Sequence, residues 1–375
     1  MALTDAENLI PVPVPPVQFQ IPQLLILDRE VDTLIRTVEA RRAFRVSGAG
    51  LTVAVLDTGL RVTHQDFAGR VPTQRNFTAD NNGDPNNASD GNGHGTNVAG
   101  IIVASGLHNG IAPMASVIPL KVLSNNGGGS FEAVVDALDW VLDNHLKYNI
   151  TVVSLSLGNT ANYAGDEEFR NSDLHERILQ LKNLRIPVVI AAGNEYFRFQ
   201  QQGMSFPAII RECVSVGAVY DANVGPRSYQ SGAQAETTAA DCITPFSQRL
   251  HQTSHTHCRT DIFAPGAPIT SSGISSDMGE SVQDGTSQAT PVISGVLMLM
   301  QEYFLKTTRK LPEVDFLVEC LRNGAVKIHD GDDEVNNVTP TRVDYLRVDA
   351  LDALDAVRRQ LQIGLLATAS PLQFI

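Results

Sequence analysis

Gly285-Thr286-Ser287-Gln288-Ala289-Thr290-Pro291 is followed directly by the apolar run Val292 to Met300, which has the character of a buried helix. The sequence therefore places a serine hydroxyl between a glycine turn and a helix start. Backbone N–H groups at a helix start lack partners within the helix, so they can stabilise negative charge beside that hydroxyl. Nucleophilic catalysis needs this combination, although an ordinary serine helix cap has the same local sequence.

The composition of the chain is that of a globular protein. Its 375 residues are 43% hydrophobic and 18% charged, which suits one large core or two small ones. The net charge of −13 disfavours nucleic acid as a partner, because phosphates would be repelled. The longest apolar run is too short to span a membrane, so no membrane partner is expected. The first residues lack the basic and apolar segments of a secretory signal, which predicts a cytoplasmic location unless export follows another route.

Strand and helix patterns alternate along the chain after residue 50. Short runs rich in β-branched residues predict strands, and segments such as Ser130–Tyr148 have the apolar spacing of helices. Nearly continuous apolar strands with helices between them predict an α/β domain, in which helices cover a parallel sheet on both faces. The predicted strands are Leu51–Leu56, Val117–Leu123, Thr151–Leu157, Val188–Ala192, Cys213–Val219 and Asp261–Ala264.

The two ends of the chain differ from this central pattern. Residues 1–40 are predicted to form an N-terminal extension, because five prolines within the first 24 residues favour an extended leader. An amphipathic helix is predicted to follow from Asp28 to Val46. Residues 41–362 are predicted to form the single α/β domain, and residues 363–375 a C-terminal tail.

Polar residues follow several of the predicted strands. Asp57 follows the first strand, and Gly193-Asn194-Glu195 follows the strand Val188–Ala192. A glycine-rich run from Asp90 to Gly100 leads into a helix that begins near His94. Each fragment alone is compatible with a turn or a helix cap. Open parallel sheets place their functional residues at the carboxyl ends of the strands, so the conjunction of these fragments favours a site there.

These fragments resemble the motifs of a known family. Val55 to Gly59 resembles the aspartate motif of the subtilisin-like serine peptidases, or subtilases. Gly93 to Gly100 resembles their histidine motif, and Gly285 to Pro291 their serine motif. The order aspartate, histidine, serine differs from the orders in chymotrypsin-like enzymes and α/β-hydrolases. The resemblance extends from about residue 44 to residue 361 and implies a doubly wound, mostly parallel sheet with helices on both faces.

The resemblance also implies a mechanism. Ser287 would be the nucleophile, His94 the general base and then acid, and Asp57 the carboxylate that orients the imidazole. Asn194 would donate its side-chain amide to the oxyanion, together with the backbone N–H of Ser287. The expected activity is endoproteolytic hydrolysis of protein or peptide substrates through an acyl-enzyme. A catalytically silent or autoinhibited binding protein and a serine esterase are the alternatives.

The same resemblance implies that a substrate binds as an extended strand between two exposed segments of the enzyme. A run of three glycines is also typical of a flexible loop, so one of these segments has a second interpretation. Glu195 matches a position at the rim of the primary specificity pocket, where a carboxylate would tolerate polar or basic side chains. The residues that match the two segments are Ser156, Leu157, Gly158 and Gly127, Gly128, Gly129.

No cofactor is required for this chemistry, but a structural calcium ion is a candidate. Asp80, Asn82 and Asp84 carry oxygen atoms at alternate positions, which suits a hard cation, and a solvated polar loop fits the same sequence equally well. Asp66 matches a ligand of the strong calcium site of many secreted relatives. The segment 101–110 is shorter than the loop that carries that site, which argues against it here.

Three residues depart from the commonest pattern of the family without removing a catalytic group. Asn97 stands where many relatives have a second histidine, and Gln288 and Thr290 replace methionine and serine.

Two further segments have open interpretations. Leu9-Ile10-Pro11 resembles a short inhibitory motif near the start of intracellular subtilisins, and a disordered leader is the alternative. Cys242 and Cys258 enclose three histidines, but the spacing matches no standard zinc pattern. A disulfide between these cysteines or a plain surface insertion is therefore favoured over a metal site. Cys213 is predicted to be a small buried side chain.

Overall fold

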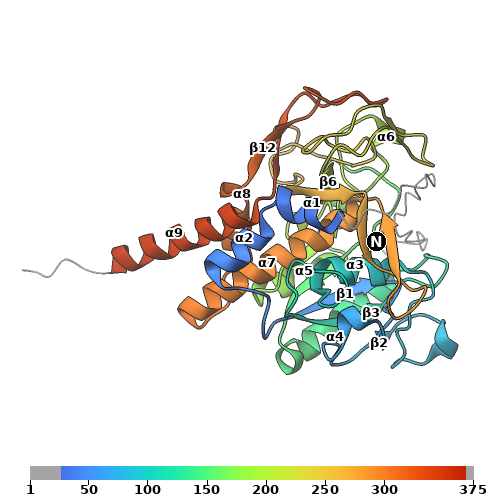
Figure 1. The fold of residues 1–375 in the computed structure, drawn as a ribbon, viewed down its shortest axis with the longest axis vertical. Helices are drawn as coiled ribbons and strands as arrows, with labels where there is room; N and C mark the ends of the chain where they lie inside the picture. The colour runs from blue at the N-terminus through green and yellow to red at the C-terminus, as the bar shows by residue number, and fades with distance from the viewer. Residues whose placement is uncertain (1–26, 369–375) are drawn as a thin grey trace, which may run out of the picture.

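The computed structural model describes the backbone of residues 27–368 and the side chains of residues 31–363 (Figure 1). The predicted proline-rich leader, including Leu9-Ile10-Pro11, lies outside the described residues. None of the helices in the described part of the chain combines the length and the hydropathy that a membrane crossing requires.

A mostly parallel sheet forms the centre of the molecule. Within the described residues it has nine strands in the order β12-β13-β9-β6-β5-β4-β1-β3-β2. All neighbouring strands are parallel except β12 and β13, which are antiparallel. The strands are β1 (Thr52–Asp57), β2 (Arg75–Asn76), β3 (Ser116–Lys121), β4 (Ile150–Leu155), β5 (Val188–Ala191), β6 (Val214–Tyr220), β9 (Ile262–Ala267), β12 (Val326–His329) and β13 (Asp344–Arg347). In the part of the chain that the structure describes, two small antiparallel pairs lie outside this sheet: β7 (Arg227–Ser228) with β8 (Gln234–Ala235), and β10 (Ile269–Ser272) with β11 (Glu280–Gln283).

Both faces of the sheet are buried. Val53 and Val55 of β1 belong to one hydrophobic core, whereas Ala54 and Leu56 belong to another. Side chains alternate between the two faces of a strand, so these cores lie on opposite sides of the sheet. The predicted fold class is therefore confirmed. The helices are α1 (Leu27–Leu34), α2 (Thr37–Phe44), α3 (His94–Val103), α4 (Phe131–Tyr148), α5 (Asp173–Asn183), α6 (Tyr196–Phe199), α7 (Thr286–Thr308), α8 (Val314–Asn323) and α9 (Ala350–Thr368), with short 3-10 turns at Gln65–Phe67, Asn81–Gly83 and Glu167–Phe169.

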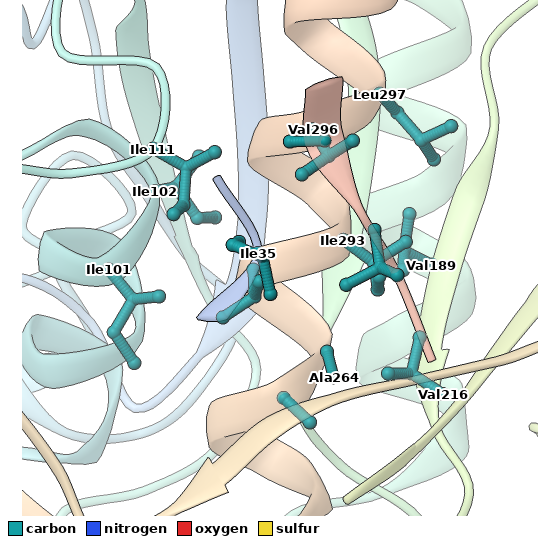
Figure 2. Packing of buried hydrophobic residues seen from close by; sticks show 14 of the residues in the cluster. Ile35, Ile101, Ile102, Ile111, Val189, Val216, Ala264, Ile293, Val296 and Leu297 are labelled. Carbon is teal, nitrogen blue, oxygen red and sulfur yellow. The ribbon is translucent and has the colours of Figure 1, made fainter. Parts of the chain in front are cut away.

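The N-terminal helices pack onto the domain. The single helix predicted from Asp28 to Val46 is wrong, because Arg36 has a left-handed backbone (φ 56°) that separates α1 from α2. The guanidinium of Arg36 is 2.6 Å from the carboxylate of Asp349, at the start of α9. Ile35 is fully buried in the same core as Ile293 and Val296 of α7 (Figure 2). Val31, Ile35 and Ala40, which lie in the segment that we assigned to an extension, thus contribute to the core of the α/β domain.

Of the two interpretations left open for Cys242 and Cys258, the structure excludes the disulfide. Cys213, Cys242, Cys258 and Cys320 are all free and buried, as we predicted for Cys213 alone. Cys242 belongs to the core on one face of the sheet and Cys258 to the core on the other, so the sheet separates the two thiols.

Candidate active site

Asp57 and His94 form a buried pair at the carboxyl end of β1. Asp57 is the last residue of β1 and His94 the first residue of α3. His94 Nδ1 lies 2.8 Å from Asp57 Oδ1, which also accepts the backbone N–H of Thr58 at 2.7 Å. The side chain of Asp57 is fully buried and His94 is 3% exposed. The carboxylate therefore fixes the orientation of the imidazole ring and leaves Nε2 as the ring nitrogen that can exchange a proton.

The pKa of His94 is raised. Burial alone would lower this pKa, because it disfavours the charged ring. The negative charge and hydrogen bond of Asp57 outweigh burial, and the charge of Asp90 adds to them. Among the described residues, His94 Nε2 has no hydrogen-bond partner. Nε2 is therefore available to accept a proton, and the charges of Asp57 and Asp90 stabilise the protonated ring.

Asp90, which the sequence analysis did not single out as a site residue, organises the loop that precedes α3. Its Oδ1 accepts hydrogen bonds from the backbone of Gly93 at 2.9 Å and from the hydroxyl of Thr58 at 3.0 Å. Its Oδ2 accepts from the backbone of Thr96 at 2.9 Å and from the Thr96 hydroxyl at 2.7 Å. A carboxylate shortly before a glycine-rich helix start is a capping signal that could have identified it. Asp90 thus joins the strand end of Asp57 to the helix of His94.

Ser287 lies in the first turn of α7. Its Oγ donates to the carbonyl of Ser156 at 3.2 Å, and the Ser156 hydroxyl donates to the carbonyl of Ser287 at 2.7 Å. In a regular helix the latter carbonyl would accept the N–H of residue 291, but Pro291 has none. Ser156 takes the place of that donor. The segment after β4 is therefore attached directly to the turn that carries the predicted nucleophile.

Asn194 contacts the same helix start. Its Oδ1 accepts from the backbone N–H of Thr286 at 3.0 Å and from the Thr286 hydroxyl at 2.8 Å. The Thr286 hydroxyl oxygen also accepts the backbone N–H of Gly193 at 3.2 Å. The oxygen end of the Asn194 amide is thereby held toward α7, beside Ser287.

Asn97 and Gln288, two departures from the family pattern, bind each other. Gln288 Nε2 lies 3.3 Å from Asn97 Oδ1, while Asn97 Nδ2 donates to the backbone carbonyl of Ser281 at 3.0 Å. This pair joins α3 to α7 close to His94 and Ser287. The two side chains therefore link the two helices directly.

A buried ion pair precedes the serine turn. Asp284 is fully buried and accepts from Arg227 at 2.9 Å. Burial raises the pKa of Asp284 to about 6, although Arg227 opposes this shift. Arg227 lies 57 positions away in the sequence, so no local pattern could have indicated this support for the turn.

The two segments predicted to bind substrate differ in exposure. Gly127 has φ +90° and closes a turn in which Ser124 accepts from Gly127 and donates to Gly128, each at 2.8 Å. Gly127 and Gly128 thus belong to a hydrogen-bonded turn. Gly128 and Gly129 are half-buried, whereas the other segment is buried beside Ser287. The members of the buried segment are Ser156, Leu157 and Gly158.

Glu195 directly follows Asn194 and is half-buried. Its backbone N–H lies 3.4 Å from Oε1 of Gln248, whose Nε2 donates to Asn162 at 2.7 Å. Burial raises the pKa of Glu195, and the charge of Arg198 partly opposes the shift.

The candidate calcium loop is held by donors of the protein itself. Oδ2 of Asp80 accepts the backbone N–H of Asn125 at 2.6 Å and lies 3.2 Å from Nζ of Lys121. Oδ1 of Asp84 accepts the backbone N–H of Asn86 at 2.9 Å. Asn82 is exposed. The ammonium of Lys121 already supplies positive charge to Asp80, so these residues fit a calcium ion poorly in this arrangement, and calcium binding stays a prediction.

Asp66, the residue that matches the other calcium site, is also satisfied by the protein. Its carboxylate accepts the backbone N–H of Leu107 at 2.7 Å, the hydroxyl of Ser272 at 2.6 Å and Nδ1 of His108 at 2.7 Å. Burial raises the pKa of Asp66, but the hydrogen bonds from His108 and Ser272 outweigh burial and hold it well below its usual range. Leu107 and His108, both in the short segment 101–110, therefore donate hydrogen bonds to the carboxylate of Asp66.

Comparison with known proteins finds related sequences over most of the length of this chain. Residues 48–325 match the model of the Subtilase family. The Extracellular serine proteinase of Thermus sp. (strain Rt41A) is 33% identical over 75% of this chain and 58% of its own length. The Intracellular serine protease of Paenibacillus polymyxa is 30% identical over 75% of this chain, and the Major intracellular serine protease of Bacillus subtilis (strain 168) is 30% identical over 74%. The match covers 76% of each of these two relatives.

Proposed function

The chain belongs to the subtilase family of serine endopeptidases, and from this premise we propose that it hydrolyses peptide bonds through Asp57, His94 and Ser287. The observation that carries this proposal is the buried hydrogen bond of 2.8 Å between Asp57 and His94. This hydrogen bond supports a role for His94 as the general base. Its Nε2 would accept the proton of Ser287, which lies in the first turn of α7.

In the proposed reaction, Ser287 Oγ attacks the carbonyl carbon of the scissile bond and His94 Nε2 takes the hydroxyl proton. The imidazolium then gives this proton to the departing amine, which leaves an acyl group on Ser287. A water molecule hydrolyses the acyl-enzyme by the same two proton transfers in reverse. Asp57 keeps its charge throughout and stabilises the imidazolium.

The oxyanion of the tetrahedral intermediate would be bound by Asn194 and by the backbone N–H of Ser287. The hydrogen bonds from Thr286 to Asn194 Oδ1 support this role, because they fix the orientation of the side-chain amide. Donors that are already oriented stabilise developing charge without the cost of reorganising at the moment of reaction.

The substrates are proposed to be proteins or peptides bound in an extended conformation. Glycines Gly127 to Gly129 and the segment Ser156 to Gly158 would contact the substrate backbone. Glu195 would favour polar or basic side chains next to the cleaved bond. Two relatives are named as intracellular enzymes, which supports the same compartment for this chain.

The test is casein digestion by the unmodified chain and by Ser287→Ala, with Ser275→Ala as a control at an exposed serine. We expect Ser287→Ala to lose about a million-fold in turnover, a magnitude taken from subtilisin, while Ser275→Ala stays fully active. A fluorophosphonate probe should label the unmodified chain at Ser287. Labelling without cleavage of casein would indicate a silent or autoinhibited protein, and hydrolysis of esters alone would indicate an esterase. Either result would overturn the proposal.

A further inference from the structure

A pocket rich in basic side chains lies at the edge of the sheet opposite the proposed catalytic residues. It is formed by the loop before β9, the last turn of α8 and the β12–β13 hairpin. Asp57 ends its strand, whereas Arg259 precedes β9 and Asp344 begins β13, which runs parallel to β9. In Figure 1, β12 and α8 lie well apart from α3. The pocket is therefore separate from the peptidase site.

The charge of this pocket contrasts with the net charge of −13 of the whole chain. Its lining contains three arginines, one lysine and two histidines, but a single carboxylate, Asp344. The six basic residues are Arg259, Arg322, Arg342, Lys327, His251 and His329. A concave surface with this composition attracts anions.

Carboxylates of the protein neutralise part of this charge. Asp344 is 2.8 Å from Nζ of Lys327 and 2.7 Å from Nδ1 of His329. Asp261, just outside the pocket, lies 3.3 Å from Nε of Arg259.

Arg322 and Arg342 are not neutralised in this way. Each donates to a main-chain carbonyl, Arg322 to that of Asp261 and Arg342 to that of Gly331. Within the described residues, neither guanidinium has a carboxylate partner. Burial and a neighbouring guanidinium lower the pKa of Arg322, and burial together with the charge of Arg322 lowers that of His251. The charge of Asp261 partly opposes the shift of Arg322, and that of Asp344 partly opposes the shift of His251, so the protein balances this positive potential only in part.

We propose that this pocket binds a multivalent oxyanion of the phosphate class, as free phosphate or as a phosphoryl group on a larger molecule. Guanidinium groups present several N–H donors in a fixed plane and bind phosphate oxygens in pairs. One monovalent carboxylate would leave part of the charge of Arg322 and Arg342 unbalanced, whereas a phosphate dianion balances both. The pocket would thus give this peptidase a ligand site that is independent of its substrate.

Isothermal titration of the full chain with inorganic phosphate tests this proposal. The titration is made in the Ser287→Ala background, so that self-digestion is avoided and binding is measured independently of peptidase activity. Chloride at matched ionic strength serves as the reference, because general screening affects both salts alike. We expect saturable phosphate binding, weakened about tenfold or more by Arg322→Gln. Arg42→Gln, which removes an exposed positive charge elsewhere, should bind phosphate like the background chain.

A second arm identifies the source of the phosphoryl group. Tighter binding of O-phosphoserine than of inorganic phosphate would indicate a phosphorylated molecule, and weaker binding would indicate free phosphate. If Arg322→Gln does not fold, Arg342→Gln replaces it, because Arg342 is exposed. Titrations that do not saturate, or arginine variants that bind phosphate as tightly as Arg42→Gln, would overturn the proposal.

Discussion

At the scale of single residues, the buried pair of Asp57 and His94 determines the pH range of the proposed activity. His94 must be neutral to accept the proton of Ser287, and Asp57 and Asp90 raise its pKa. The pair also contributes to folding. A histidine whose pKa is higher in the folded state stabilises that state fully below its unfolded pKa, and this contribution is lost as pH rises through the folded pKa.

The first prediction concerns the acid limb of the pH profile. We expect kcat/KM to fall with decreasing pH around a value above the ordinary histidine pKa of about 6.5, because His94 is then protonated. Asp57→Asn removes the charge that raises this pKa, so the limb should move to lower pH. The rate should also fall by about 3 × 10⁴-fold, a magnitude carried over from subtilisin. An unchanged acid limb in Asp57→Asn would contradict the assigned pairing.

Residues within contiguous motifs could be predicted from the sequence, whereas residues that support them from a distance could not. Asp57, His94, Asn194 and Ser287 each lie in a short motif next to a strand or helix end. Lys121 is different: its buried ammonium donates to the carbonyl of Thr58 at 2.6 Å, a contact made across 63 positions. Nothing in the sequence around Lys121 indicates this contact, because it depends on the register of neighbouring strands.

At the scale of elements, the start of α7 depends on close contact with β9. The backbone N–H of Gly285 donates to the carbonyl of Gly266 at 2.8 Å. A Cβ atom at Gly266 would lie 2.7 Å from the carbonyl oxygen of Gly285 and 2.8 Å from Cβ of Ala218. Glycine at position 266 therefore allows the turn before Ser287 to approach the strand.

The second prediction is that Gly266→Ala lowers kcat by about a hundredfold, because the displaced turn misplaces the Ser287 hydroxyl. Steady-state kinetics on a peptide substrate measures this loss. Gly50→Ala is the control, since Gly50 has φ +79° and no atom within 4 Å of an added Cβ. This control should lower stability through backbone strain and leave kcat unchanged. Equal kcat values for the two variants would contradict the proposed displacement.

Elements with strong periodicity were predictable, and those stabilised by distant packing were not. The helix predicted over Ser130–Tyr148 corresponds to α4, whose N-cap Ser130 accepts from Ala133 at 3.2 Å. The β12–β13 hairpin was not predicted, because each of its strands has only four residues and β13 does not alternate between polar and apolar side chains. The break between α1 and α2 was also missed, since an arginine in a left-handed conformation has no signature in the sequence.

At the scale of the whole molecule, the chain beyond the family match helps to complete the core. The match begins at residue 48, yet Ile35 is fully buried against the elements of the domain (Figure 2). The backbone carbonyl of Ile35 accepts from Ala350 at the start of α9. The N-terminal helices and α9 therefore close one face of the sheet together.

The third prediction follows from this packing. Ile35→Ala should lower the free energy of unfolding by about 2–5 kcal/mol, because it leaves a cavity in the core. Chemical denaturation measures the loss. The value of kcat/KM should be unchanged below the unfolding transition. A loss under 1 kcal/mol, which is roughly the effect of a surface substitution, would show that the N-terminal helices contribute little to folding.

The fourth prediction addresses calcium. Asp80 and Asp84 already accept hydrogen bonds from the protein, so we expect calcium to change the unfolding temperature by less than about 1 °C, a shift that corresponds to under about 1 kcal/mol for a chain of this size. Differential scanning calorimetry with calcium and with a chelator measures the change. A larger rise that disappears in Asp84→Ala would instead establish the predicted ion in this loop.

The buried cysteines have a practical consequence for labelling experiments on the folded protein. All four thiols are buried, and burial raises the pKa of Cys242, Cys258 and Cys320 to about 12. Alkylating reagents attack thiolates, so these side chains should resist them in the folded protein. A cysteine introduced on the surface would then be the only readily labelled position, and a single fluorophore there could report on substrate cleavage without removing any native thiol.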